Sequence, residues 1–247
     1  MIRTFHHHYF LHLDHHLART VQSMQLLGWD YQLDEERLRR AIHELATAYP
    51  APELRVRIDV LAEPVTARGS ASRELIALMP FTPPPDELYQ TGVAVGYATG
   101  LHRANPLAKT ADFAAVRKAA AVGTFYEYLM VDDQAQILEA TSANFYGVRD
   151  GVVYTAGAGV LEGVTRRIVL ELVAAQGLPL QLQAVHRNKV SKLDEAFISS
   201  SSRGLLPVVQ IGDQRIGDGR PGPITKQLMA AYQAYVEAHL QTASYAA

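Results

Sequence analysis

The segment ILEATSANFYGVRDGVVYTAGAGVLEGVTRRIVLEL, Ile137–Leu172, contains both kinds of regular secondary structure. Runs of apolar and aromatic residues at Asn144–Val148 and Val152–Tyr154 are typical of short strands. The residues that follow have apolar side chains at helical spacing, which predicts a helix over Thr165–Ala175. Strands followed closely by a helix indicate a mixed α/β fold.

Strands and helices continue to alternate on both sides of this segment. In the second half, the sequence predicts strands at Tyr126–Val131, Phe197–Ser199 and Pro207–Ile211, and helices at Thr110–Ala121 and Ile224–Leu240. The first half is predicted to form helices at His16–Leu27 and Asp34–Ala46, and strands at Leu54–Val60, Glu74–Met79 and Gly92–Ala98.

The stretch TGLHRANPLAKT, residues 99–110, marks a change in composition ahead of an alanine-rich helix. We therefore expect an α/β protein of the α+β type with two mixed α/β domains. The small N-terminal domain is predicted to cover residues 1–98 and the larger C-terminal domain residues 107–247. Residues 99–106 would form the loop between them.

Composition excludes several classes of protein. The chain has 247 residues, 48% of them hydrophobic, and no cysteine, so it has no thiolate nucleophile, zinc finger or iron–sulfur cluster. The 25 acidic and 23 basic residues give no field that attracts nucleic acid or anionic lipid. No apolar run is long enough to span a bilayer, and the start MIRTFHHHYF lacks a signal-peptide core. We expect a soluble, cytoplasmic protein without a nucleic-acid or membrane partner.

Histidine is concentrated near the start of the chain, where six of the ten lie between Phe5 and His16. A metal site needs fixed geometry and usually carboxylate partners. Three consecutive histidines on a strand would point to alternating faces, and Asp14 is the only carboxylate nearby. We expect a solvated, partly stacked histidine surface and no metal site.

The helix after Gly163 is a candidate phosphate site. Its first backbone N–H groups and the positive end of the helix dipole favour an anion, and Thr165 adds a hydroxyl. An ordinary helix start capped by threonine is an equally good interpretation. The spacing of Gly157, Gly159 and Gly163 is one residue too long for a dinucleotide fingerprint, so a Rossmann site is disfavoured.

The serine-rich stretch SSSSRGLL, Ser199–Leu206, follows an apolar strand. Its hydroxyls and Arg203 form a plausible anion cradle, although such a stretch on its own is more often a plain turn. Together with the helix start, it indicates a cofactor that carries a phosphate.

Four segments, in this order, resemble the fold-type IV pyridoxal-phosphate enzymes, which include branched-chain aminotransferases, D-amino-acid aminotransferases and aminodeoxychorismate lyases. The resemblance covers residues 106–229 almost without gaps and implies pyridoxal 5'-phosphate bound between two domains. The segments are AKTADF (Ala108–Phe113), ILEATSANFYGVRDGVVYT (Ile137–Thr155), GVLEGVTRRIVLEL (Gly159–Leu172) and FISSSSRGLLPVVQIGDQRIGDGRPGPITKQL (Phe197–Leu228).

The resemblance implies two catalytic residues, Lys109 and Glu139. Lys109 would form the Schiff base with the cofactor and move the proton of the substrate α-carbon. At a junction between domains this amine can be desolvated, which lowers its pKa. Glu139 would hold the pyridine nitrogen. It ends the apolar strand LMVDDQAQILE, where a buried carboxylate needs a cationic partner.

Further contacts are implied for the cofactor and the substrate. For the substrate acid, Arg203 follows from its residue type and Arg57 from its place on a strand face. The cofactor-binding residues implied are Arg3, Lys109, Glu139, Asn144, Gly163, Val164, Thr165 and Ser201, and the substrate-binding residues are Ser202, Arg203 and Arg57.

The sequence departs from the family pattern at three places. Only Met1 and Ile2 precede Arg3, the expected phosphate-binding arginine. Phe113 stands where the family often has a tyrosine that contacts the ring hydroxyl. Glu162 stands where many aminotransferases have proline.

We expect a branched-chain-like aminotransferase that moves an amino group between an amino acid and a 2-oxo acid and works as a homodimer. The late segment IGDGRPGPITKQL resembles aminotransferases more than lyases. The alternative is an aminodeoxychorismate lyase, which would use the same lysine to eliminate pyruvate. A third reading is a non-catalytic cofactor- or metal-binding protein, and the short N-terminus and Phe113 favour it.

Overall fold

A computed structural model describes residues 1–64, 66, 69, 71–98, 100, 101, 103–120 and 123–243, with the backbone alone at 118–120. The chain forms two compact units, Met1–Pro83 with Val236–Ala247, and Pro84–Tyr235. The predicted boundary at residues 99–106 therefore lies inside the larger unit. The reason is strand β5 (Val93–Ala98), which pairs with two strands of the larger unit's sheet.

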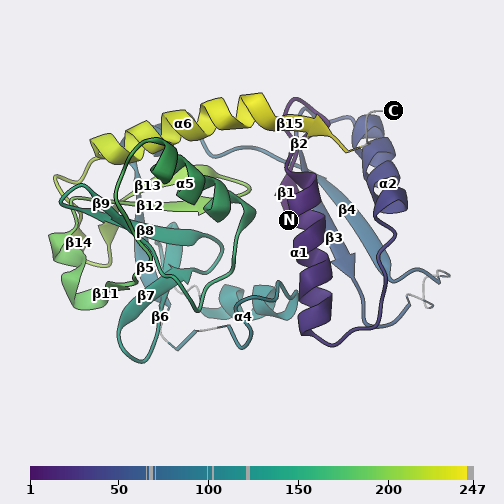
Figure 1. Cartoon of the computed structure of the whole chain (residues 1–247), viewed down its shortest axis with the longest axis horizontal. Coiled ribbons are helices and arrows are strands. Elements are labelled where there is room, and N and C mark those ends of the chain that lie inside the picture. Colours follow the sequence, from purple (N-terminus) through teal and green to yellow (C-terminus); the bar gives the residue numbers. More distant parts are fainter. Residues whose placement is uncertain are drawn as a thin grey trace. The chain divides into compact units, whose positions relative to one another are not determined.

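The smaller unit contains a three-stranded antiparallel sheet in the order β1-β3-β4 and two helices. The chain end returns to this unit because β15 (Leu240–Thr242) pairs with β2 (Tyr9–Leu11). Phe10, Leu17 and Ile42 belong to the hydrophobic core of this unit. Figure 1 shows the two helices beside the strands of the sheet. The elements are β1 (Ile2–Arg3), β3 (Leu54–Val60), β4 (Glu74–Pro80), α1 (Leu13–Leu26) and α2 (Glu35–Ala48).

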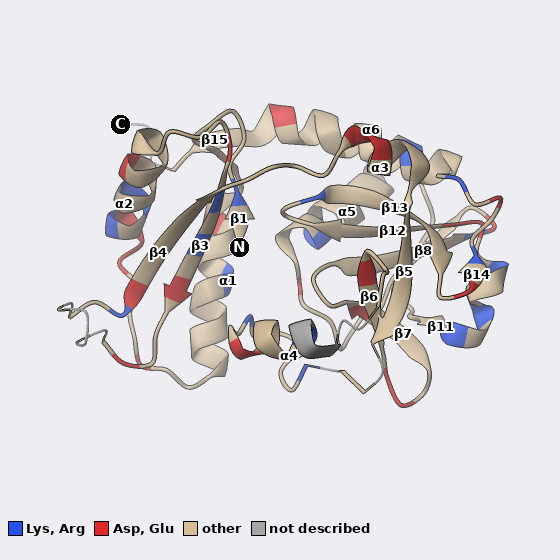
Figure 2. Ribbon diagram, turned by 180° about the vertical axis from the view of Figure 1, so that it is seen from behind, with Lys and Arg blue, Asp and Glu red and all other residues tan. Residues whose placement is uncertain are grey.

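Local sequence accounts for the start of α2 but not for that of α1. The Asp34 side chain caps α2 by accepting the N–H of Arg37, and acidic residues follow in the first turn. The charged residues of α2 are the blue and red bands of Figure 2. The first helix, α1, begins at Leu13, three residues before the predicted His16. Its N-cap residue His12 has a left-handed backbone, and the helix starts at the next residue.

The larger unit is built on a ten-stranded sheet. Pairing between β7 and β8 closes a ring of strands in the order β7-β8-β12-β13-β5-β6. Leu129, Phe145 and Ile198 belong to its apolar core. The strands not yet bounded are β6 (Glu127–Val131), β7 (Gln136–Ala140), β8 (Asn144–Arg149), β9 (Val152–Tyr154), β10 (Leu180–Gln181), β11 (Val185–His186), β12 (Glu195–Ser200), β13 (Gly204–Ile211) and β14 (Gln214–Arg215).

The predicted single strand ending at Glu139 is two strands, β6 and β7. The Asp132 carboxylate accepts the N–H groups of Gln134 and Gln136 and stabilises a turn between them. This turn brings Glu139 back beside β6.

Helices complete the fold. α5 packs against β12 (Figure 1), and most of its buried residues are apolar. None of the helices that the structure describes combines the length and the apolar character needed to cross a bilayer. The remaining helices are α3 (Asp86–Thr91), α4 (Asp112–Ala120), α5 (Val164–Ala175), α6 (Pro223–His239) and a 3-10 helix at Arg187–Lys192.

Candidate active site

Glu139 is a buried carboxylate near the end of β7, with only 2% of its surface exposed. Its Oε2 accepts hydrogen bonds from Asn144 Nδ2 and from the Leu161 backbone N–H, each at 3.2 Å. Its Oε1 accepts a hydrogen bond of 2.8 Å from Arg103 Nε. Burial raises the pKa of Glu139, while the charges of Arg103 and Lys109 oppose the rise.

Arg103 is the cation that the sequence required for Glu139 but did not identify. Its guanidinium lies 3.8 Å from the centroid of the Phe113 ring, and the side chain is 9% exposed. Phe113 therefore provides an aromatic face for a cation in this structure. The available signal was the expectation that a buried carboxylate needs a positive partner, together with an arginine in the polar stretch before Lys109.

The N-terminus of α5 lies next to the Glu139 group. Asn144 Nδ2 also donates to the Leu161 carbonyl oxygen at 2.9 Å, which ties the loop before α5 to Glu139. Gly163 occupies the N-cap without a side-chain cap, so the helix start capped by a threonine is not formed. The first N–H groups of α5 thus have no partner within the helix.

Two hydroxyls accompany this helix start. Thr165 is buried, and its Oγ1 lies 3.4 Å from Ser201 Oγ at the β12–β13 turn. The structure thus brings the two predicted anion-binding elements together. Glu162 is exposed, so its carboxylate faces solvent.

Arg203, predicted to bind the substrate acid, is held in an ion pair, and its substrate-binding role stays a prediction. Its guanidinium lies 3.2 Å from Glu127 Oε2 and donates to Ser142 Oγ at 2.6 Å, and its Nε donates to Ser200 Oγ at 3.0 Å. Sequence reasoning missed the pair because Glu127 lies 76 positions earlier, within an apolar strand.

Glu127 is buried and ionised. Burial would raise the pKa of this carboxyl, but the Arg203 guanidinium and the hydroxyls of Ser142 and Thr141 outweigh it and lower the pKa. The pair thus anchors the β12–β13 turn that carries Ser201 and Ser202.

Arg117, on α4, is a half-buried arginine that the sequence analysis overlooked. Among the residues the structure describes, no carboxylate lies within ion-pair distance of it. Desolvation lowers the pKa of Arg117; Glu127 opposes this effect, and the positive charges of Arg203 and Arg103 add to it. Arg117 is therefore close enough to these residues for electrostatic coupling.

The remaining predicted residues have different surroundings. Lys109 is exposed in the single chain, whereas a desolvated amine was expected. Ser202 is half-buried beside Ser200, with 3.5 Å between the hydroxyls.

Arg3 and Arg57 belong to the smaller unit. Arg3 is ordered on β1, where it pairs with Glu53 and stacks on Phe5 and Phe81. Arg57 is exposed and pairs with Asp59 at 2.6 Å. The roles predicted for these two arginines stay predictions.

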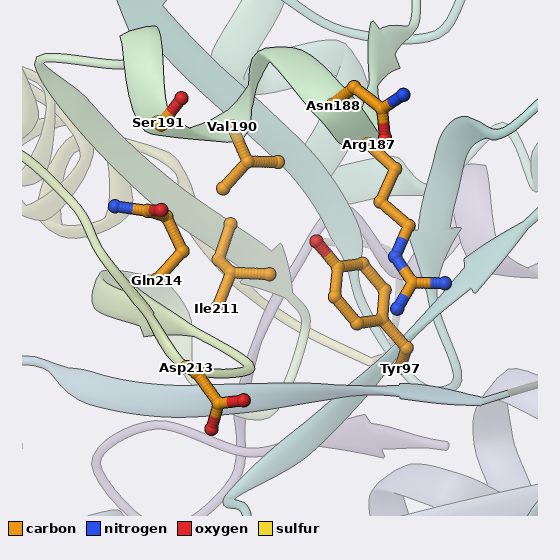
Figure 3. Close-up of a pocket in the computed structure, with 8 residues that line it drawn as sticks. All are labelled: Tyr97, Arg187, Asn188, Val190, Ser191, Ile211, Asp213 and Gln214. Carbon is orange, nitrogen blue, oxygen red and sulfur yellow. The ribbon is translucent and has the colours of Figure 1, made fainter.

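A separate polar hollow of about 320 Å³ opens elsewhere in the larger unit (Figure 3). The Arg187 guanidinium lies over the Tyr97 ring, 4.2 Å from its centroid, and Asp213 lies across the hollow. The lining residues include none of the Glu139 group, so this hollow is not the candidate active site.

The sequence profile of the family described as Amino-transferase class IV matches residues 1–211. The chain belongs to this family. A D-alanine aminotransferase from Bacillus licheniformis is 28% identical over 236 residues, covering 90% of this chain and 81% of the relative.

Solved structures support the fold. A branched-chain aminotransferase from Thermoproteus uzoniensis, crystallised with norvaline, has a TM-score of 0.83 at 24% identity and covers 98% of this chain and 88% of its own. The Thermobaculum terrenum branched-chain aminotransferase, in its PLP-bound holo-form, has a TM-score of 0.81 at 22% identity and covers 99% and 88%.

These findings confirm the predicted family, the fold-type IV architecture and the assignment as an enzyme. This class IV aminotransferase exchanges amino groups between amino acids and oxo acids, and the cofactor of the class is pyridoxal phosphate. The aminodeoxychorismate lyase alternative gains no comparable support.

Proposed function

We propose that this class IV aminotransferase exchanges amino groups between an apolar amino acid, branched or alanine-like, and a 2-oxo acid. We further propose that it works as a homodimer in the cytoplasm. The observation that carries the catalytic part is Glu139, a buried carboxylate held by three donors, one of them a cation. The named substrates of the D-alanine and branched-chain relatives support the substrate class.

The residues present suit pyridoxal phosphate. Glu139 would hold the pyridine nitrogen, because a buried carboxylate favours a positively charged partner. The first N–H groups of α5, with the Thr165 and Ser201 hydroxyls, would hold the phosphate. Lys109 would bind the cofactor covalently, and Asn144 would keep the Glu139 carboxylate in position.

When bound, the cofactor supplies an electron sink for the electron pair released at the substrate α-carbon. The Lys109 amine would act as a base that takes the proton from the substrate α-carbon. In the reverse half of the exchange it would act as an acid that returns a proton to the α-carbon. The Leu161 N–H donates to Glu139 Oε2 and opposes the rise in pKa that burial causes, and Asn144 Nδ2 donates to the same oxygen.

Arg103 Nε donates a hydrogen bond to Glu139 Oε1. It neutralises a buried charge that would otherwise be costly. We propose that a protonated ring nitrogen would neutralise the same carboxylate when the cofactor is bound.

The substrate carboxylate needs a cation that is not already in an ion pair. The donors of Arg203 are directed at Glu127, Ser142 and Ser200, so Arg203 is poorly suited. We propose Arg117 for this role, because it is half-buried and electrostatically coupled to the site.

The reaction type is tested by a half-reaction. Enzyme loaded with pyridoxal phosphate is mixed with one amino acid at a time, from a panel of L- and D-forms, while the visible spectrum is recorded. An aminotransferase keeps the donor's nitrogen, so its visible band should fall with an apolar donor and return when a 2-oxo acid is added. An unchanged band across the panel, with pyruvate released from aminodeoxychorismate, would establish the lyase instead.

A further inference from the structure

Part of the histidine-rich N-terminal segment is gathered into a compact donor cluster in the smaller unit. His12, Asp14 and His15 each present one ligand atom, and these atoms all lie within 4.8 Å of one another. His15 Nε2 is 3.3 Å from Asp14 Oδ2, and His12 Nδ1 is 4.0 Å from Asp14 Oδ1. The sequence-based argument against a metal site concerned a different arrangement, in which His6–His8 lie on a strand; these residues form a turn instead.

The backbone at His12 is not one that selects histidine. The residue is in the left-handed region, with φ 49° and ψ 55°, where glycine or asparagine is favoured. It also occupies the N-cap of α1, but its side chain makes no capping hydrogen bond. The ring instead stacks on His15, with 4.5 Å between centroids and 18° between planes.

A third histidine reaches the cluster from the other end of the chain. Strand β15 pairs with β2 so that Leu240 lies opposite Leu11. His239 and His12 are the next residues beyond this pair, and their ring centroids are 5.9 Å apart. The same pairing of β15 with β2, visible in Figure 1, thus brings a third imidazole ring near the cluster.

We propose that His12, Asp14 and His15 bind one divalent transition-metal ion, with Zn²⁺ as the best match, and that His239 completes the set. Imidazole nitrogen with a single carboxylate suits zinc in four-coordinate geometry. Calcium and magnesium prefer sites made entirely of oxygen ligands and are poor matches. The ion would link the start of α1 to His239 at the end of α6. Its role would therefore be structural and independent of transamination.

Zinc titration of the purified, metal-stripped full chain tests the proposal by calorimetry, with cobalt absorbance as a second readout. We expect one Zn²⁺ per chain and a rise in Tm when it binds. The double variant His12→Asn/His15→Ala keeps a residue that tolerates the left-handed backbone at position 12. It should weaken zinc binding by at least about tenfold and abolish the rise in Tm.

The matched control is His6→Ala/His8→Ala, which removes two histidines from the same stretch but outside the cluster. It should bind zinc as the parent does. Three results would overturn the proposal: no zinc bound by the parent, unchanged affinity in the His12/His15 variant, or loss of binding in the control. Circular dichroism of each variant without metal separates lost ligands from lost folding.

Discussion

At the scale of single residues, the candidate site depends on which charges are already paired. Glu127 and Arg203 satisfy each other, and Glu139 is satisfied by Arg103. Arg117 shares this electrostatic environment without an ion-pair partner among the described residues. Substitution should therefore affect stability at the Glu127–Arg203 pair, turnover at Glu139 and substrate binding at Arg117.

Glu139→Gln should leave a folded enzyme that reacts far more slowly. Removing one member of a buried charge pair costs about 3–5 kcal/mol. If most of this loss falls on the transition state, turnover drops about 10²–10³-fold. Single-turnover kinetics of the loaded enzyme measure the effect, with the exposed Glu162→Gln as control. Turnover within a few-fold of the parent would show that another group holds the ring nitrogen.

Arg117→Leu should raise KM for the amino acid while kcat stays within a few-fold. A charge-assisted hydrogen bond contributes about 1.5–3 kcal/mol, which corresponds to roughly a tenfold to hundredfold rise. Steady-state kinetics measure both parameters. Arg187→Leu, in the separate hollow, is the control and should leave both unchanged. A fall in kcat at constant KM would contradict the assignment to substrate binding.

Glu127→Gln should lower the free energy of unfolding by about 3–5 kcal/mol at neutral pH, because Arg203 loses its buried partner. The pKa of Glu127 is lowered on folding, so its stabilisation is complete above its unfolded pKa of about 4.3 and is lost as the pH falls through the folded value. The difference from the parent should therefore shrink in acid. Urea unfolding between pH 7 and pH 3 tests this, with the exposed Glu87→Gln as control. A difference that is constant or grows in acid would refute the ion-pair account.

At the scale of elements, the start of α5 and the strands β7 and β8 act together. The register that places Glu139 opposite Asn144 lets one amide bind both the carboxylate and the Leu161 carbonyl before α5. A side chain at Gly163 would place its Cβ 2.6 Å from Asn144 Oδ1. Glycine is needed here for space, since its φ of −68° is open to any residue.

Gly163→Ala should therefore weaken cofactor binding by displacing Asn144, which positions both Glu139 and the loop before α5. We expect at least about a tenfold loss in affinity, as for other positioning groups around a bound ligand. Fluorescence titration with pyridoxal phosphate measures it. Glu162→Ala changes the adjacent exposed residue and should bind normally. Equal affinity in the two variants would separate Gly163 from the cofactor site.

Local pattern was sufficient for most elements, and distance in sequence explains what was missed. Strand β3 was predicted over the same residues that form it, because it alternates strictly. The start of α1 and the turn between β6 and β7 were missed, because a left-handed His12 and the bonds accepted by Asp132 leave no periodic signal. The predicted anion elements at Thr165 and Ser201 do meet. The pairs Arg103–Glu139 and Glu127–Arg203 depend on contacts 36 and 76 residues apart, which no local pattern reveals.

At the scale of the whole molecule, strand pairing decides which of the two units each segment of the chain belongs to. Strand β5 belongs to the larger sheet, and the C-terminal β15 returns to the smaller unit. A boundary based on composition alone could not show either connection. Lys109 follows the stretch in which that boundary was predicted, and it is exposed in the single chain.

The most direct test of the proposed function is the site at which pyridoxal phosphate becomes attached. The loaded enzyme is reduced with borohydride, digested and analysed by mass spectrometry, for the parent, Lys109→Ala and the exposed control Lys192→Ala. We expect the cofactor mass on the peptide containing Lys109 in the parent and in the control. We expect no labelled lysine and no visible cofactor band in Lys109→Ala. Cofactor attached to one of the other lysines, or an undiminished band in Lys109→Ala, would contradict the central claim.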